Sequence, residues 1–239
     1  MPKHALLNNI VHKNLGIITK KSAQYGDDVS GSLIFPEEFT AVQREYPIFF
    51  QKDADSGEFQ SVAIFGFKHN ENLFLTEQGW NATYIPALME REPFLIGFQS
   101  EAPGAEPTPM IYVDMENPRI TTVTEGEPVF LPHGGNTAYI DRISKILLLI
   151  HEGLNISKSM FDVFTGLDLI EPFTLEIEFN NGEHYKSIAY YTLNQEKFFA
   201  LDDENLGKLH RSGYLHYAYM VIASLGNIKT LIDRRNSLI

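Results

Sequence analysis

The sequence contains no cysteine, a single tryptophan and no long apolar run. The absence of cysteine excludes disulfide bonds, thiolate nucleophiles and cysteine-ligated zinc or iron–sulfur centres. Apolar runs such as Ile146–Ile150 are far shorter than the ~20 residues that a membrane-spanning helix needs, so we expect no membrane insertion. The first ten residues contain no stretch typical of a signal peptide. We therefore expect a cytoplasmic protein and leave leaderless export to the cell surface open.

Basic residues are in the minority. The chain has 19 Lys and Arg against 31 Asp and Glu, which gives a formal net charge of −12. This charge repels phosphate, so neither nucleic acid nor an anionic membrane surface is an expected partner. Hydrophobic residues make up 44% of the 239 residues, which predicts a globular core rather than a disordered chain.

One hairpin pattern occurs twice. Polar turns at Asp53–Gly57 and Asn180–Gly182 each separate two apolar segments. Asn-Gly between alternating apolar residues is a strong hairpin signal, because both turn positions need a positive φ. After the turns, Ser61–Phe65 aligns with Ser187–Tyr191, with one residue inserted near the start of the second copy. The sequence therefore predicts two antiparallel hairpins.

The alignment of the two copies extends past the hairpins. Asn72–Leu75 in the first copy matches Lys197–Leu201 in the second, and we expect both segments to be extended. Residues 45–75 and 172–201 are predicted to superpose, with the serines that open the two aligned strands on equivalent faces. Convergence of two unrelated hairpins on similar residues is the alternative to duplication.

Two segments have the apolar spacing of helices. The first begins after Gly134–Thr137, with Asn136 or Thr137 as N-cap, and is predicted to reach about Leu154. The second covers 205–235 and follows the acidic residues Asp202–Glu204, which suit a helix N-terminus. Its broad apolar face must be buried, so we expect this C-terminal helix to dock on the sheet.

The strands do not alternate strictly with helices, which favours the α+β class with a largely antiparallel sheet. We expect two similar hairpin units packed by a central helix and a long C-terminal helix. A single domain spanning 1–239 is predicted, and duplication would divide it into related halves at about 1–130 and 131–239.

Motifs for catalysis or metal binding are sparse. His69 and Glu71 form an H-x-E pair, which a distant histidine at 133, 151 or 184 would complete into a two-His, one-carboxylate iron site. Such pairs are common by chance, and the sequence has neither a G-x-S-x-G nor a G-x-G-x-x-G motif. We predict no catalytic residues, no metal and no cofactor.

The candidate binding residues are Trp80, Tyr84, Arg91 and Phe94, together with Glu45. Tryptophan and arginine are effective anchors, because they combine a large contact area with directional donors. The alternative is structural: Trp80 packs in the core, and Arg91 pairs with Glu45 or another buried carboxylate.

Short motifs carry a resemblance to a known family. In chain order they are Glu45-Tyr-Pro-Ile48, Asn72-Leu-Phe74, Trp80, Tyr84-Ile-Pro86, Arg91, Pro93-Phe94, Asp114, Glu127-Pro-Val-Phe130 and Asp203-Glu204. This ordered set resembles the bacterial SapC family, named for a surface-layer-associated protein, and it covers nearly the whole chain. One departure is Glu90, where the family often has a second basic residue.

The resemblance implies a link to a bacterial surface or uptake system and names no reaction. It does not extend to the peptide-transport permease that shares the family's name, because this sequence lacks the membrane spans of a permease. We therefore favour a non-catalytic binding or accessory protein that acts on another protein or peptide, and leave a homo-oligomer open.

The alternative is an enzyme with a site near Trp80 and Arg91, such as a metal-dependent oxygenase or a hydrolase. An enzyme is expected to have a polar pocket with convergent titratable groups. A binding module is expected to have an exposed aromatic patch instead.

Overall fold

A computed structural model describes residues 3–100 and 106–239 of the chain. The fold is α+β, as predicted, and every paired strand of the described chain is antiparallel to its neighbour. The chain forms two compact units: unit 1 consists of Met1–Asp27 and Ala87–Glu152, and unit 2 of Asp28–Pro86 and Gly153–Ile239. Each unit contains residues from both sides of residue 130, so the two compact units do not correspond to the sequence segments 1–130 and 131–239.

Unit 1 contains two small sheets. Their strand orders are β1 (His4–Leu6), β9 (Thr108–Asp114) and β8 (Phe94–Gln99), then β10 (Ile120–Thr122), β2 (Leu15–Ile17) and β11 (Glu127–Pro128). Two short helices also belong to this unit: η1 (Ala23–Tyr25) and α2 (Ala87–Glu90). Apolar side chains from the sheets pack on Ile140, Ile143 and Leu147 of helix α3 (Ala138–Gly166), which forms the core of this unit.

Helix α3 begins where the sequence predicts and continues further. The Thr137 hydroxyl accepts a hydrogen bond from the Ile140 N–H (3.4 Å), so Thr137 is the cap. The helix runs for 29 residues and passes the predicted end at Leu154. It continues because buried apolar residues return at helical spacing at Phe161 and Phe164.

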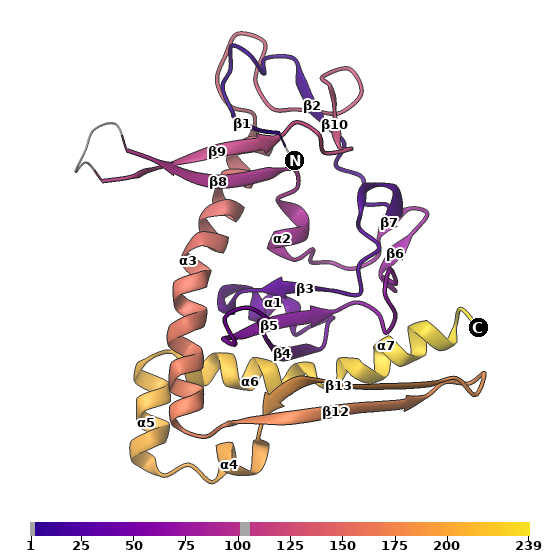
Figure 1. Ribbon diagram of the computed structural model, residues 1–239, viewed down its shortest axis with the longest axis vertical. Coiled ribbons are helices and arrows are strands. Elements are labelled where there is room, and N and C mark those ends of the chain that lie inside the picture. Colours follow the sequence, from indigo (N-terminus) through magenta and orange to yellow (C-terminus); the bar gives the residue numbers. More distant parts are fainter. Residues whose placement is uncertain (1–2, 101–105) are drawn as a thin grey trace. The chain divides into compact units, whose positions relative to one another are not determined.

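Unit 2 is built on a five-stranded sheet (Figure 1). The strand order is β12 (Ile170–Glu178), β13 (His184–Leu193), β4 (Ile48–Lys52), β5 (Phe59–Ile64) and β3 (Gly31–Ile34). The two predicted hairpins are confirmed as β4–β5 and β12–β13, and they lie side by side because Tyr191 pairs with Phe50. The remaining short elements are η2 (Pro36–Glu38), α1 (Phe39–Val42), β6 (Leu75–Thr76), β7 (Gly79–Trp80) and α4 (Gln195–Phe199).

Two details of the predicted repeat are wrong. The segment Lys197–Leu201 is not extended, because α4 covers most of it and the Asn194 side chain caps this helix by accepting from the Lys197 N–H. The aligned serines also point to opposite faces of the sheet. Ser61 pairs with Phe50 and shares its face, whereas a bulge in β13 moves Ser187 to the other face, with Tyr190.

The C-terminal region is helical over nearly the predicted range, in three consecutive helices: α5 (Asp203–Arg211), α6 (Tyr214–Ser224) and α7 (Asn227–Asn236). Asp202 caps α5 by accepting from the Asn205 N–H, and Gly213, at φ 81°, separates α5 from α6. Helix α6 packs on β13 and β4 (Figure 1), so this region docks on the sheet as predicted. None of the helices in the described chain combines the length and hydrophobicity required to span a bilayer.

One buried hydroxyl contributes to the docking of α6, and we expect its contribution to the free energy of unfolding to be measurable. Ser224 is fully buried; its Oγ accepts from the Ile48 N–H (2.9 Å) and donates to the Val221 carbonyl (2.6 Å). Ser224→Ala leaves the Ile48 N–H buried without a partner, so we expect unfolding in urea to show a loss of about 1–3 kcal/mol. Ser237→Ala is the control, because the exposed Ser237 hydroxyl makes a similar bond to Arg234. Equal effects of the two variants would contradict this account.

Candidate functional site

Three of the predicted binding residues, Glu45, Trp80 and Tyr84, lie together in unit 2. Trp80 Nε1 donates to the Tyr46 hydroxyl (2.7 Å), which in turn donates to the Tyr84 carbonyl oxygen (2.6 Å). The Glu45 carboxylate accepts from the backbone N–H groups of Thr83 (2.9 Å) and Tyr84 (3.1 Å). These hydrogen bonds therefore connect the segment that contains Glu45 and Tyr46 to the segment that contains Trp80, Thr83 and Tyr84.

Trp80 also packs in an aromatic cluster. Its ring lies 5.2 Å from that of Phe65, and the ring of the fully buried Tyr46 contacts both Phe65 and Phe74. Burial raises the pKa of the Tyr46 hydroxyl well above its ordinary value. A hollow of about 290 Å³ beside Trp80 is lined only by residues of the β6–β7 hairpin and the next residue, Asn81. These contacts favour a structural role for Trp80.

Arg91 and Phe94 belong to unit 1. Arg91 Nη1 donates to the Phe94 carbonyl oxygen (2.6 Å), and Nη2 lies 3.4 Å from the Glu92 carboxylate. The Phe94 side chain is fully buried in the core of this unit. Arg91 therefore has a partly exposed carboxylate partner, and Phe94 presents no surface to a ligand.

The glutamate of the H-x-E pair, Glu71, is also engaged by the protein. Glu71 accepts from the Phe67 N–H (2.7 Å), and its other oxygen lies 3.3 Å from Arg235 Nε. Within residues 3–100 and 106–239, no three His, Asp or Glu side chains are grouped so that they could hold a metal ion. That the protein binds no metal stays a prediction.

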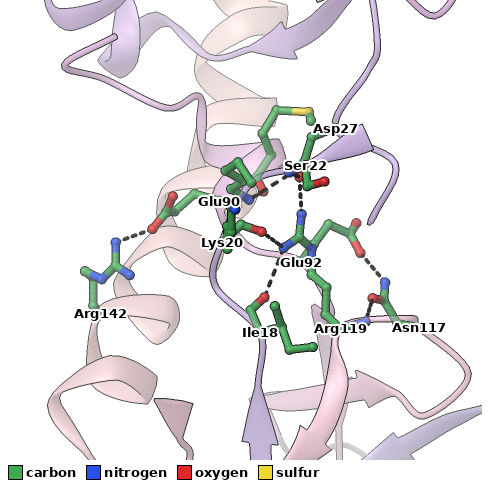
Figure 2. Close-up of polar contacts among 11 residues, drawn as sticks. Ile18, Lys20, Ser22, Asp27, Glu90, Glu92, Asn117, Arg119 and Arg142 are labelled. Atoms are coloured by element: carbon green, nitrogen blue, oxygen red, sulfur yellow. Dashed lines mark hydrogen bonds and ion pairs between the residues drawn. The ribbon is translucent and has the colours of Figure 1, made fainter. Parts of the chain in front are cut away.

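A buried ionic network in unit 1 was not predicted (Figure 2). The Arg119 side chain is 1% exposed and donates to Asp27 (2.5 Å) and to the carbonyl oxygens of Ile18 and Lys20 (3.0 Å each). Asp27 also accepts from the Ser22 N–H (2.7 Å). The guanidinium therefore joins the segment that follows β2 to the turn before β10.

Lys21 is the second cation of this network. Its Nζ donates to the Met89 carbonyl oxygen (2.5 Å) and lies 3.8 Å from Asp27. Burial lowers the pKa of Lys21, Arg119 lowers it further, and Asp27 acts in the opposite direction. The adjoining cavity measures about 10 Å³, enough for no more than one water molecule. The network therefore positions the chain and offers no room for a ligand.

A cavity of about 580 Å³ lies within unit 2. This size is within the range of small-molecule sites. The sheet side is formed by β3, β5 and the β4–β5 turn, and the helix side by the C-terminal part of α3. The lining residues are Leu33, Ile34, Phe35, Lys52, Gly57, Glu58, Phe59, Gln60, Ser61, Leu154, Ser157, Lys158, Phe161, Asp162, Thr165 and Gly166.

Helix α3 packs closely on other parts of unit 2 at two places beside this cavity. A methyl group added to Gly153 would lie 2.6 Å from Phe35 Cβ, so only glycine allows α3 to come this close to Phe35. Further along the helix, the Phe161 ring contacts Phe50 (4.9 Å between centroids) and Phe59 (5.8 Å). Leu154, which also lines the cavity, keeps 58% of its surface exposed.

Ser61 is the most deeply buried of the polar residues in this lining. It is 2% exposed, and its Oγ has no hydrogen-bond partner among the described residues. A buried hydroxyl without a partner costs free energy, so such a group in a native structure calls for an explanation. Although Ser61 is among the lining residues of the cavity, its Oγ has almost no accessible surface, so this atom is enclosed by the protein.

The rim of the cavity carries balanced charge. Lys158 and Glu58 form an exposed ion pair at 3.3 Å. The Lys52 ammonium lies over the rings of Phe59 (5.2 Å) and Tyr191 (5.5 Å). With Asp162, the lining includes two cations and two anions, so the cavity has no excess of one sign to attract an ion.

The sequence pointed to Ser61 only through the hairpin repeat. The α3 residues of the cavity, such as Leu154 and Phe161, are read from the sequence as ordinary members of an apolar helix face. Nothing in local spacing shows that the helix and the sheet leave a cavity between them beside these residues, so no sequence signal could have identified it.

The comparisons with known proteins give one match. A family model described as SapC matches residues 7–231 of the chain. No curated protein and no solved structure matches it.

The Lys21 network predicts a dependence of stability on pH. The pKa of Lys21 is lowered from 10.5 in the folded protein, so the unfolded chain binds this proton more tightly. The Lys21 contribution to the free energy of unfolding therefore rises with pH, from the lowered pKa up to about 10.5. Between about pH 7 and 10, urea unfolding is expected to show that the free energy of unfolding of wild type increases relative to that of Lys21→Met. Lys20→Met, at the exposed neighbour, is expected to keep a constant difference from wild type. A constant difference for Lys21→Met would contradict the prediction.

Proposed function

We propose that this chain, which belongs to the SapC family, is a non-catalytic binding protein that takes a small molecule into the cavity between β5 and α3. Its place is in a bacterial surface or uptake system, as an accessory protein. The link to the surface comes from the family's name, and the binding role comes from the cavity.

The cavity supports a binding role by its size and by its mixture of apolar and polar lining residues. Small-molecule sites are mostly apolar concavities of about 300–1,000 Å³ with a few polar groups that orient the ligand. Here Leu33, Phe59 and Phe161 supply apolar surface. Ser157 and Thr165 supply polar groups.

The surroundings of Ser61 favour binding over nucleophilic catalysis. A catalytic serine needs a base within hydrogen-bond distance, and that base is usually oriented by a third group. No such partner contacts Ser61 Oγ among the described residues, and the lining residues include no histidine. The carboxylate of Glu58 is held at the exposed rim by Lys158.

An exposed aromatic pair supports the predicted protein or peptide partner. Phe199 on α4 is 64% exposed and Tyr219 on α6 is 46% exposed. Both rings contact that of Phe198, at 5.4 and 5.2 Å between centroids, so the two exposed rings flank one buried ring. Exposed aromatic rings are typical of interaction surfaces. A cytoplasmic location is also part of this proposal, with leaderless export to the cell surface as the alternative.

The enzyme alternative placed its site near Trp80 and Arg91. The indole N–H of Trp80 is taken by Tyr46, and Arg91 is engaged by Phe94 and Glu92. These contacts hold the residues in structural roles, and we therefore place the enzyme second.

Filling the cavity is expected to abolish small-molecule binding. Ser157→Trp places an indole in the cavity, whereas Ser159→Trp puts the same side chain at an exposed position of the same helix, outside the cavity. Naphthalene, as an apolar probe, is expected to bind wild type and Ser159→Trp, and to bind Ser157→Trp at least tenfold more weakly, as followed by probe fluorescence. Circular dichroism checks that both variants fold. Equal binding by both variants, or no binding by wild type, would contradict the proposal.

A further inference from the structure

We infer that strand β3 is a docking edge for an extended segment of a partner protein, which adds to the sheet as a further strand and places one side chain in the cavity beside α3. This inference rests on the proposed function, because it uses the same cavity, and it names the partner: a peptide side chain takes the place given there to a small molecule. The free backbone groups of β3, the hollows on both of its faces and the contrast with the opposite edge carry it.

Strand β3 forms one edge of the unit 2 sheet (Figure 1). The Ser30 carbonyl oxygen accepts from the Phe65 N–H (2.8 Å), and β3 continues this antiparallel register with β5. Every second residue therefore bonds to β5, and the residues between them, Gly31 and Leu33, direct their N–H and C=O groups away from the sheet. Within the described chain, neither of these two N–H groups has a hydrogen-bond partner. An added strand would supply both partners.

The opposite edge of the sheet, β12, is protected against strand addition. Pro172 is exposed and has no N–H to donate, and the exposed Glu176 and Glu178 add negative charge. A bulge between Phe173 and Leu175 interrupts the regular pairing. Proline, charge and bulges are the devices by which natural proteins prevent pairing at an edge. Strand β3 reads Gly-Ser-Leu-Ile and contains neither proline nor charge, so its edge lacks these protections.

Each face of β3 borders a hollow. The cavity of about 580 Å³ reaches β3 at Leu33 and Ile34. A second hollow, of about 260 Å³, is lined by residues 30–33 together with Gln51, Val62, Ile64 and Tyr190. Val62 follows Ser61 on β5, so its side chain points to the face opposite the cavity. Successive side chains of an added strand alternate in the same way, and they would therefore meet the two hollows in turn.

The two hollows predict a side-chain pattern for the partner. A residue opposite Ser32 directs its side chain to the face of the cavity, and its two neighbours face the smaller hollow. All residues that line the smaller hollow are uncharged. We therefore expect one large side chain between two small uncharged ones. Because only two residues of β3 face outward, the backbone bonds are few, and the side chains supply much of the affinity and the specificity.

A second copy of the chain does not suit this edge. The net charge of −12 makes two copies repel each other. Pairing of β3 with β3 would join four residues of each copy, whereas a stable interface takes about 20–30 residues a side. The occupant is therefore a segment of a different chain, and a neutral or basic segment complements the acidic protein.

Short random peptides selected for binding to the full chain test this inference. The selected peptides are expected to show the predicted side-chain pattern. In one of them, methylation of alternate backbone nitrogens on the edge that faces β3 is expected to weaken binding at least about tenfold, because it removes the donors and blocks the approach of the strand. Methylation of the intervening nitrogens is expected to have less than about a threefold effect. Fluorescence anisotropy of the labelled peptide measures both.

Variants of the protein test the same contacts from the other side. Leu33→Pro removes the outward N–H without removing a bond to β5, as proline does on edge strands, whereas Leu33→Val keeps that N–H. Leu33→Pro is expected to bind the selected peptide at least about tenfold more weakly than Leu33→Val. Ser157→Trp, which fills the cavity, is also expected to weaken peptide binding, and the exposed Ser159→Trp is not. Circular dichroism checks that the variants fold, and the methylated peptides probe the unchanged protein.

The outcomes separate this inference from the proposed function. If the selection yields no peptide, if both methylation patterns act equally, or if Leu33→Pro binds as tightly as Leu33→Val, strand addition at β3 is wrong. If Ser157→Trp leaves peptide binding unchanged, no side chain enters the cavity and the inference is wrong. Naphthalene bound by wild type would still uphold the proposed function in each of these cases, whereas failure of naphthalene to bind contradicts that function directly.

Discussion

Strand β4 is the element on which unit 2 depends. It pairs with β5 along its whole length and with β13 at Phe50, so it joins the two hairpins into one sheet. The Phe50 ring is fully buried and contacts Phe161 of α3, which holds the helix over the same face. Because Ser61 pairs with Phe50 across the strands, one row of residues sets both the packing of the helix and the position of the unsatisfied hydroxyl.

The two polar features described above differ in how completely they are satisfied. Asp27 and the terminal nitrogens of Arg119 find partners in unit 1, and only Nε of this guanidinium has none. A buried charge left wholly unpaired would cost several kcal/mol. Ser61 in unit 2 has no partner, and Leu154 beside the same cavity remains exposed. Both of these reduce stability, and proteins keep such costs mainly where function requires them. The contrast supports a structural role for the network and a binding role for the cavity.

Local signals predicted most elements of the fold. The Asn-Gly turn, the cap at Thr137 and the acidic entry at Asp202 act within a few residues, so each is readable from the sequence. The errors arise where tertiary context decides. A bulge in β13 turns Ser187 away from the face of Ser61, and the cap at Asn194 starts a helix where the repeat predicted an extended segment. The predicted binding residues divide between the two units, since short motifs carry no information on which unit each joins.

The sequence by itself determined the α+β class, both hairpins, the start of the central helix and the family, because these depend on periodicity, turn chemistry and ordered motifs. Only the tertiary structure decided which apolar residues pack and which enclose empty space. Phe161 contacts Phe50 and also lines the cavity, although the sequence marks it only as apolar. The pairing of Arg119 with Asp27 joins positions 92 residues apart. Contacts at such separations depend on how the elements pack together, and local spacing does not encode them.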